Sequence, residues 1–221
     1  MMLRFQLDDI RRALPQYGEI GVGRADGKQA DEYSAILYDR RRLTVQASGT
    51  FWFSDTPEVP GSTSFGNRIP RICTWARFLD TESRARFACF NQHWDHRSQP
   101  SRVRSAALLL QRIAGLGEHL PVLVTGDFNA GEHNPAFRSL VAPGTGLRDS
   151  FRRVHPHATG VGTFHGFGGR PGRNKIDAVL ASSEWTVLRA SILPVTGKAP
   201  FPSDHLPVTA TLLLRPQRSP R

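Results

Sequence analysis

Four short segments of this chain share one pattern, in which a hydrophobic run ends abruptly in Asp, Asn or His. A strand end delivers a polar side chain to the rim of a sheet while the strand itself stays rigid. Each segment alone fits a purely structural role, such as a turn, a helix cap or an ordinary strand end. All four in one chain predict that the fold gathers these side chains into one site. The segments are residues 91–96, 125–129, 175–179 and 202–208.

The residue types in these segments suit metal-assisted hydrolysis. Asp127 and Asn129 stand two apart, so an extended chain turns both to the same side while Phe128 faces the core. A carboxylate beside a carboxamide offers oxygen ligands to a hard divalent cation and an amide donor to a phosphate or a water. Asp204 and His205 reach one pocket from a loop, and the ordinary pKa of histidine suits it to deprotonating water near neutral pH.

The hydrophobic patterns predict an α/β fold of two packed sheets flanked by helices. Apolar positions indicate an amphipathic helix over 3–14 and a second helix, capped by Ser101, that ends near Gly115. Residues 72–78 and 86–93 alternate like the two strands of a hairpin. Further strands are expected over 33–38, 43–48, 121–125, 175–181 and 207–214, with long loops over 55–70 and 160–173. We expect one domain over residues 1–214 and a disordered basic tail over 215–221.

Composition adds a weaker indication about partners and location. The chain carries 29 Lys and Arg against 19 Asp and Glu, a net charge of +10. Such an excess favours phosphorylated partners, with nucleic acid among the candidates, although a basic proteome explains the charge equally well. No stretch is apolar enough to span a membrane and no secretory segment is evident, so we expect a cytoplasmic location. Cys73 and Cys89 lie on neighbouring predicted strands, where a bridge is conceivable, but we favour buried free thiols.

With these motifs the chain resembles the endonuclease/exonuclease/phosphatase family over about residues 3–214. Residues 125–129 (TGDFN) and 203–208 (SDHLPV) carry the most specific part of the resemblance. The resemblance implies a four-layer deoxyribonuclease-I-like sandwich, in which two mixed sheets pack face to face with helices outside. It also implies divalent-metal-dependent hydrolysis of a phosphoester by a histidine- and metal-activated water, with Mg²⁺ or Mn²⁺ as cofactor. The substrate stays open among DNA, RNA, phospholipids and small phosphoesters.

The resemblance further assigns roles to individual residues. His205 is expected to be the general base, held by Asp177, while Asp127 and Asn129 position the water and the scissile phosphate. His93 is expected to contact the phosphate or to protonate the leaving oxygen. The remaining expectations are Asp204, Asp127 and Asn129 as metal ligands, Glu32 as the residue that orients His93, and Arg71 as a phosphate-binding arginine.

Three other polar residues near these motifs have simpler interpretations. Strand alternation turns Asp95 to the same side as His93 and His96 away from it, so we interpret Asp95 and His96 as polar loop residues. His165 lies in the glycine-rich loop where members of the family place substrate contacts, which makes it a candidate for lining the cleft.

The start of the chain departs from the family pattern. Members of the family open with a strand that carries an asparagine and a second strand whose final glutamate is a principal metal ligand. This chain has Met1 and Met2 at that place, and its first helix lacks a usual N-cap residue. We therefore expect an N-terminally truncated domain without its first strands and with a weakened metal site. The alternative to an enzyme is a catalytically impaired remnant that binds polyanions or nucleic acid.

Overall fold

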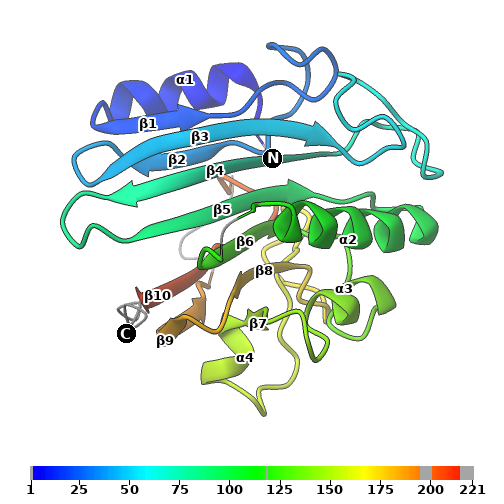
Figure 1. The fold of residues 1–221 in the computed structure, drawn as a ribbon. Helices are drawn as coiled ribbons and strands as arrows, with labels where there is room; N and C mark the ends of the chain where they lie inside the picture. Colours follow the sequence, from blue (N-terminus) through cyan, green and yellow to red (C-terminus); the bar gives the residue numbers. More distant parts are fainter. Residues whose placement is uncertain (1, 118, 195–200, 215–221) are drawn as a thin grey trace.

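The computed structural model describes residues 2–117, 119–194 and 201–214. Its central sheet is built from β3 (Leu43–Trp52), β4 (Ile72–Asp80), β5 (Arg86–His93), β6 (Val122–Asp127), β7 (Arg148–Asp149) and β8 (Asp177–Ala181). These strands lie in the order β3-β4-β5-β6-β8-β7, and Figure 1 shows them running across the molecule. β5 and β6 are parallel, whereas every other neighbouring pair in this sheet is antiparallel.

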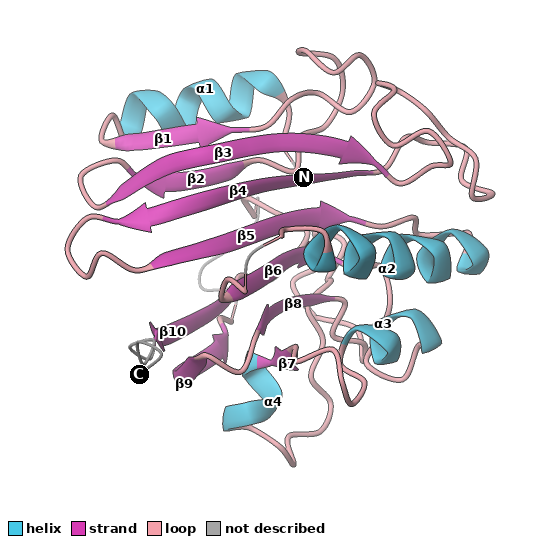
Figure 2. Ribbon diagram, in the orientation of Figure 1, coloured by secondary structure: helices cyan, strands magenta, loops and turns pink. Residues whose placement is uncertain are grey.

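Helices cover one face of this sheet. α2 (Gln99–Ala114) provides the crossover that a parallel β5–β6 pair requires, and α3 (Pro135–Leu140) packs beside it (Figure 2). Leu109 of α2 and Phe137 of α3 are almost fully buried against Phe90 and Val124 of the sheet. This layer forms the larger of the two hydrophobic cores.

Two antiparallel ribbons lie on the other side of the sheet. One pairs β1 (Tyr17–Ile20) with β2 (Ile36–Asp39), and the other pairs β9 (Trp185–Ile192) with β10 (Val208–Leu214). Their side chains join Phe78 and Phe87 in the second core. α1 (Arg4–Ala13) lies outside the first ribbon, as Figure 1 shows, and α4 (Ser150–Val154) lies beside β9. The expected mixed sheets with flanking helices are therefore confirmed.

Several individual elements differ from their predicted form. The first helix and the β4–β5 hairpin are present, but Ser98 rather than Ser101 caps α2, because its hydroxyl accepts a hydrogen bond from the Ser101 N–H at 3.2 Å. Pro100 fits within the first turn, where its missing N–H costs nothing. The strand β9 was not predicted, and the predicted tail (215–221) lies outside the described residues. None of the described helices combines the length and apolar character needed to cross a membrane.

The sheet brings three of the polar strand ends to one place. β5 ends at His93 and β6 at Asp127, and these two residues are partners in the parallel ladder. β8 runs antiparallel to β6, so its first residue, Asp177, lies opposite Asp127. Gly126 permits this close approach, since it has φ +132° and a Cβ there would lie 2.0 Å from the carbonyl oxygen of Gln92.

Both cysteines are free, and they are not opposite one another on the β4–β5 pair, where Cys73 faces Gln92 and Cys89 faces Ala76. Burial raises the pKa of Cys89 to about 12 and raises that of Cys73 well above its ordinary value. Because the thiolate is the reactive form, we expect neither thiol to react with Ellman's reagent in the folded protein at mildly alkaline pH. Both should react after denaturation. A thiol that reacts equally fast in the folded and unfolded protein would contradict this expectation.

Candidate active site

A histidine and two aspartates meet where β6 and β8 lie side by side. The Nδ1 atom of His205 lies 2.8 Å from Oδ2 of Asp177, and its Nε2 atom lies 3.9 Å from Oδ2 of Asp127. A carboxylate only accepts hydrogen bonds, so Nδ1–H of His205 donates to Asp177. In the neutral ring the lone pair is then on Nε2, the nitrogen that faces Asp127.

The charges in this group act strongly on one another. Burial, followed by the charge of Asp177, raises the pKa of Asp127 to about 6. Burial alone would lower the pKa of His205, but the hydrogen bond and charge of Asp177 and the charge of Asp127 outweigh it and raise that pKa. The site therefore holds two closely spaced carboxylates whose mutual repulsion a positive charge relieves.

The donor set fits a hard divalent cation. Asp127, Asp177 and His205 each offer one ligand atom, and these atoms all lie within 4.8 Å of one another. Carboxylate oxygens are the ligands that Mg²⁺ prefers, and Mn²⁺ also accepts imidazole. Burial and the neighbouring charge of Asp177 raise the pKa of Asp127, and a bound cation would oppose both effects.

Asn129 fixes the orientation of the Asp127 carboxylate. Its backbone N–H donates to Oδ1 of Asp127 at 2.8 Å, and its Nδ2 lies 2.9 Å from the carbonyl oxygen of Trp94 and 3.2 Å from Oδ2 of Asp127. Phe128 is fully buried between Trp94 and Phe137, as expected. The expectation of extended chain was wrong at Asn129, whose φ of 44° is left-handed and folds its amide back onto Asp127.

His93 lies on the other side of Asp127. Its Nε2 is 3.5 Å from Oδ2 of Asp127, and its Nδ1 is 3.7 Å from Oε2 of Glu32. Glu32 in turn forms an ion pair with Arg24 at 2.6 Å. Burial and the charge of Arg71 lower the pKa of His93 well below 6.5, so the ring is neutral at physiological pH. Glu32 thus lies near His93 but beyond hydrogen-bond distance, and its role in orienting His93 stays a prediction.

Arg71 is a buried residue beside His93 that contacts three side chains. Its side chain is only 3% exposed, and its Nε lies 3.3 Å from Oδ2 of Asp95. Its Nη1 lies 2.9 Å from Nε2 of His93, and its Nη2 lies 2.7 Å from Nδ1 of His96. Each nitrogen of this guanidinium therefore contacts a protein group, while Nη1 and Nη2 each carry a second N–H. Phosphate binding by Arg71 stays a prediction.

Asp95 and His96 are polar residues of the loop between β5 and α2, as interpreted, but both contact Arg71. Asp95 is buried, and its Oδ1 accepts from the N–H groups of Arg97 and Ser98 at 2.9 and 2.7 Å. This tight turn before α2 ends the strand alternation and swings His96 back toward Arg71. An Asp followed closely by a helix-capping serine is the sequence signal that would have indicated the turn.

The comparisons with known proteins identify the family and the fold. The model of the endonuclease/exonuclease/phosphatase family matches residues 12–205, which is most of the chain. The chain belongs to this family. A mannosyl-6-phosphatase from Bacteroides thetaiotaomicron is 35% identical in sequence, with a TM-score of 0.86 over 95% of this chain and 82% of that one. A family protein from Bacteroides vulgatus is 34% identical, with a TM-score of 0.87 over 96% and 82% of the two chains.

A curated relative is more distant. The uncharacterized protein L388 of Acanthamoeba polyphaga mimivirus is 29% identical over 128 residues, which are 56% of this chain and 47% of the viral protein. The chain thus spans about half the length of the curated relative that it matches. The two bacterial structures, in contrast, cover nearly all of this family member.

Asp204 in this family member stands apart from the carboxylate cluster. Within the described residues its side chain makes no hydrogen bond or ion pair, while its carbonyl oxygen accepts from the N–H groups of His165 and Gly166. Its charge contributes to raising the pKa of His205. Metal binding by Asp204 stays a prediction. His165 is buried beside Phe201 and accepts from Gly169 N–H at 3.3 Å, so it holds the glycine-rich loop in place.

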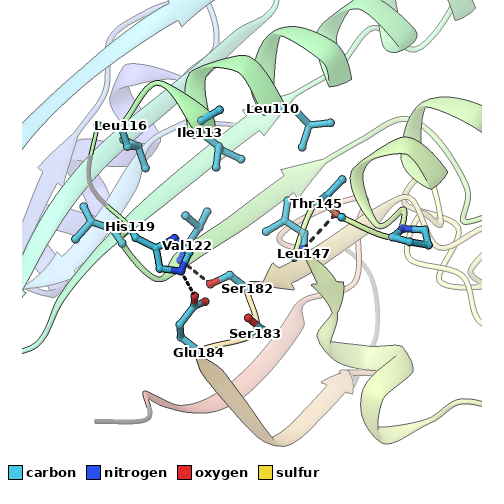
Figure 3. Close-up of a pocket in the computed structure, with 16 residues that line it drawn as sticks. Leu110, Ile113, Leu116, His119, Val122, Thr145, Leu147, Ser182, Ser183 and Glu184 are labelled. Atoms are coloured by element: carbon cyan, nitrogen blue, oxygen red, sulfur yellow. Dashed lines mark hydrogen bonds and ion pairs between the residues drawn. The ribbon is translucent and has the colours of Figure 1, made fainter. Parts of the chain in front are cut away.

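A second hollow lies far from these residues, at the other end of β6 (Figure 3). Its walls are largely apolar, and His119 Nε2 pairs with Glu184 Oε1 at 3.0 Å at one side. β6 begins at Val122 in this hollow and ends at Asp127, and a strand rises about 3.3 Å per residue. The hollow is therefore separate from the carboxylate site. Its labelled apolar residues are Leu110, Ile113, Leu116, Val122 and Leu147.

Proposed function

We propose that this chain hydrolyses a phosphoester with a water activated by His205, in the presence of a divalent cation. The observation that carries the proposal is the hydrogen bond from His205 to Asp177, which turns the Nε2 lone pair toward Asp127. A basic nitrogen beside buried carboxylates is the arrangement that accepts a proton from water. The similarity to a mannosyl-6-phosphatase supports a phosphatase acting on a small phosphomonoester rather than a nuclease.

Each residue of the site has a separate role in the proposed hydrolysis. His205 takes a proton from the attacking water while Asp177 stabilises the resulting imidazolium. The water oxygen forms a bond to phosphorus, the bond from phosphorus to the leaving oxygen breaks, and the leaving oxygen takes up a proton. His93 lies beside Asp127 with its Nε2 accepting from Nη1 of Arg71, and contact between this ring and the phosphate is part of the proposal, while Asn129 keeps the Asp127 carboxylate oriented. These roles are consistent with the distances around Asp127.

The cation site uses the same carboxylates. Asp127 and Asp177, with Asn129 and Asp204 as further candidates, would hold Mg²⁺ or Mn²⁺, while the Nε2 lone pair of His205 stays free for the water. When bound, such a cation withdraws charge from the phosphoryl oxygens and acidifies water. The proposal therefore makes activity depend on a divalent metal.

Metal removal is expected to abolish hydrolysis. Loss of several kcal/mol of charge stabilisation corresponds to a rate decrease of at least about a hundredfold. The test is release of p-nitrophenol from p-nitrophenyl phosphate and from bis-p-nitrophenyl phosphate with Mg²⁺, with Mn²⁺ and with EDTA. Re-addition of metal to the chelated protein should restore the rate.

Two outcomes would contradict parts of the proposal. An unchanged rate in EDTA contradicts the metal requirement. If the folded protein hydrolyses neither of the two aryl esters nor any natural phosphoester, the proposal that it is an enzyme is contradicted. The net charge of +10 favours the alternative in that case, a domain that binds polyanions. Salt-dependent binding of the inactive protein to a polyanion such as heparin would test it.

A further inference from the structure

His96 is held in a single orientation and a single tautomer. Its Nδ1 lies 2.7 Å from Nη2 of Arg71. A guanidinium is always protonated and can only donate, so Nδ1 of His96 must be the acceptor. In the neutral imidazole the proton is then on Nε2. Burial and the charge of Arg71 also lower the pKa of His96, which favours the neutral ring.

The free side of this ring faces away from the protein core. His96 is exposed, in contrast to the buried Asp95 beside it and to Arg71, which is 3% exposed. Since Nδ1 is occupied, the Nε2–H group is the part of the ring available to a ligand. Within the described residues that N–H has no hydrogen-bond acceptor.

One guanidinium group separates His96 from the proposed reaction centre. Arg71 contacts His93 through Nη1 and His96 through Nη2, and His93 lies 3.5 Å from Oδ2 of Asp127. If the scissile phosphate lies against His93 and Asp127, His96 is at the edge of that site, one guanidinium group away, where its exposed ring can meet the part of the substrate beyond the phosphate.

Two of the arginines near His96, Arg71 and Arg102, have their charges turned toward protein groups, whereas Arg97 beside it is exposed. Each of the three nitrogens of Arg71 contacts a protein group. Arg102 is held by Oε1 of Gln99 and by the carbonyl oxygen of Asp95. A neutral N–H donor suits an alcohol oxygen, whereas an additional phosphate is matched best by unpaired cations.

We propose that His96 is a specificity-determining residue that donates its Nε2–H to a hydroxyl group on the alcohol part of the substrate. The preferred substrate is then a polyhydroxylated phosphomonoester, such as a sugar phosphate. This inference rests on the proposed phosphoester hydrolysis. It adds a substrate class and a residue that selects it.

The test compares a hexose 6-phosphate with p-nitrophenyl phosphate, whose leaving group has no hydroxyl neighbours. His96→Ala should lower kcat/KM for the sugar phosphate by about tenfold or more, the effect of one lost hydrogen bond in a polar site. It should leave kcat/KM for the aryl phosphate unchanged. His119→Ala removes an exposed histidine at the second hollow and should change neither value.

Two further variants separate substrate contact from the positioning of Arg71. In His96→Asn, Oδ1 takes the place of Nδ1 and keeps the contact with Arg71, but no donor remains at the position of Nε2. The kcat/KM of this variant for the sugar phosphate should therefore be about as low as that of His96→Ala. In His96→Gln, the side-chain amide reaches the position of Nε2 and should recover part of the lost kcat/KM.

The outcomes separate this inference from the function on which it rests. Equal losses on both esters in His96→Ala, restored by His96→Asn, would show that His96 only holds Arg71, and would overturn the inference. So would an unchanged kcat/KM for the sugar phosphate. A protein that hydrolyses the aryl ester but no sugar phosphate overturns the substrate class alone. A protein that hydrolyses neither ester overturns the proposed function, and the inference with it.

Discussion

Replacing His205 by alanine is expected to lower kcat for phosphoester hydrolysis by about 10²- to 10⁴-fold, the range that a positioned general base contributes. The reason is the geometry at Nε2, the nitrogen nearest to Asp127 and the one left basic by the hydrogen bond from Nδ1 to Asp177. Steady-state rates on p-nitrophenyl phosphate with Mg²⁺ or Mn²⁺ measure the effect. His157→Ala, which removes an exposed loop histidine, is the matched control and should leave kcat unchanged.

The same kcat measurement can be made on a variant of Asp177. Asp177→Asn keeps the shape of the side chain but no longer fixes the proton on Nδ1, so it should also lower kcat strongly. Residues that act as one unit give losses that do not add. The double variant Asp177→Asn/His205→Ala should therefore be about as slow as His205→Ala alone. If the fold decrease in kcat of the double variant equals the product of the two single decreases, the two residues act independently. A His205→Ala protein with normal kcat would refute the role of His205.

Local sequence patterns were enough to predict the parts of the fold that carry a clear period. α1 shows helical spacing of apolar residues, and β4 and β5 alternate cleanly because one face packs under α2. β9 has no such signal. Most of its residues are only half-buried or exposed, and Arg189 and Thr186 interrupt its apolar positions. A strand in a two-stranded ribbon needs little burial, so its sequence lacks the pattern from which strands are recognised.

The candidate site could be predicted at its strand ends but not at its turns. The approach of Asp127 to His93 and to Asp177 follows from three motifs that lie on neighbouring strands, whereas the pairing of Asp177 with His205 was expected from the family resemblance. The link from Arg71 to His96 joins residues 25 positions apart through a turn that has no period. The left-handed backbone at Asn129 likewise depends on acceptors supplied by Trp94. Tertiary contacts of this kind leave little trace in a single sequence.

Lys175 is another residue whose role the sequence did not reveal, although it opens one of the four motifs. Its side chain is fully buried, with Nζ 2.6 Å from Oδ2 of Asp149 and 3.6 Å from Oε1 of Glu132. Lysine is almost never fully buried without a partner. Asp149 also caps α4 by accepting from the N–H of Phe151 at 2.9 Å. The lysine therefore neutralises a buried carboxylate that organises the segment leading to β8.

Replacing Lys175 by methionine is expected to lower the free energy of unfolding by about 3–5 kcal/mol, because methionine fills a similar volume but leaves the Asp149 carboxylate buried without its cation. Urea denaturation followed by circular dichroism measures the change. Lys28→Met, at an exposed position, is the matched control and should change the free energy of unfolding by less than about 0.5 kcal/mol.

The double variant Asp149→Asn/Lys175→Met tests whether the uncompensated charge is the cause. Asparagine keeps an oxygen that can cap α4 but carries no charge, so the second substitution should restore part of the stability lost in Lys175→Met. We expect a favourable coupling of roughly 0.5–3 kcal/mol between the two positions. Additive losses of stability would instead assign the effect to packing around the side chain of Lys175. Its Nζ atom lies 5.2 Å from the ring centre of Phe137.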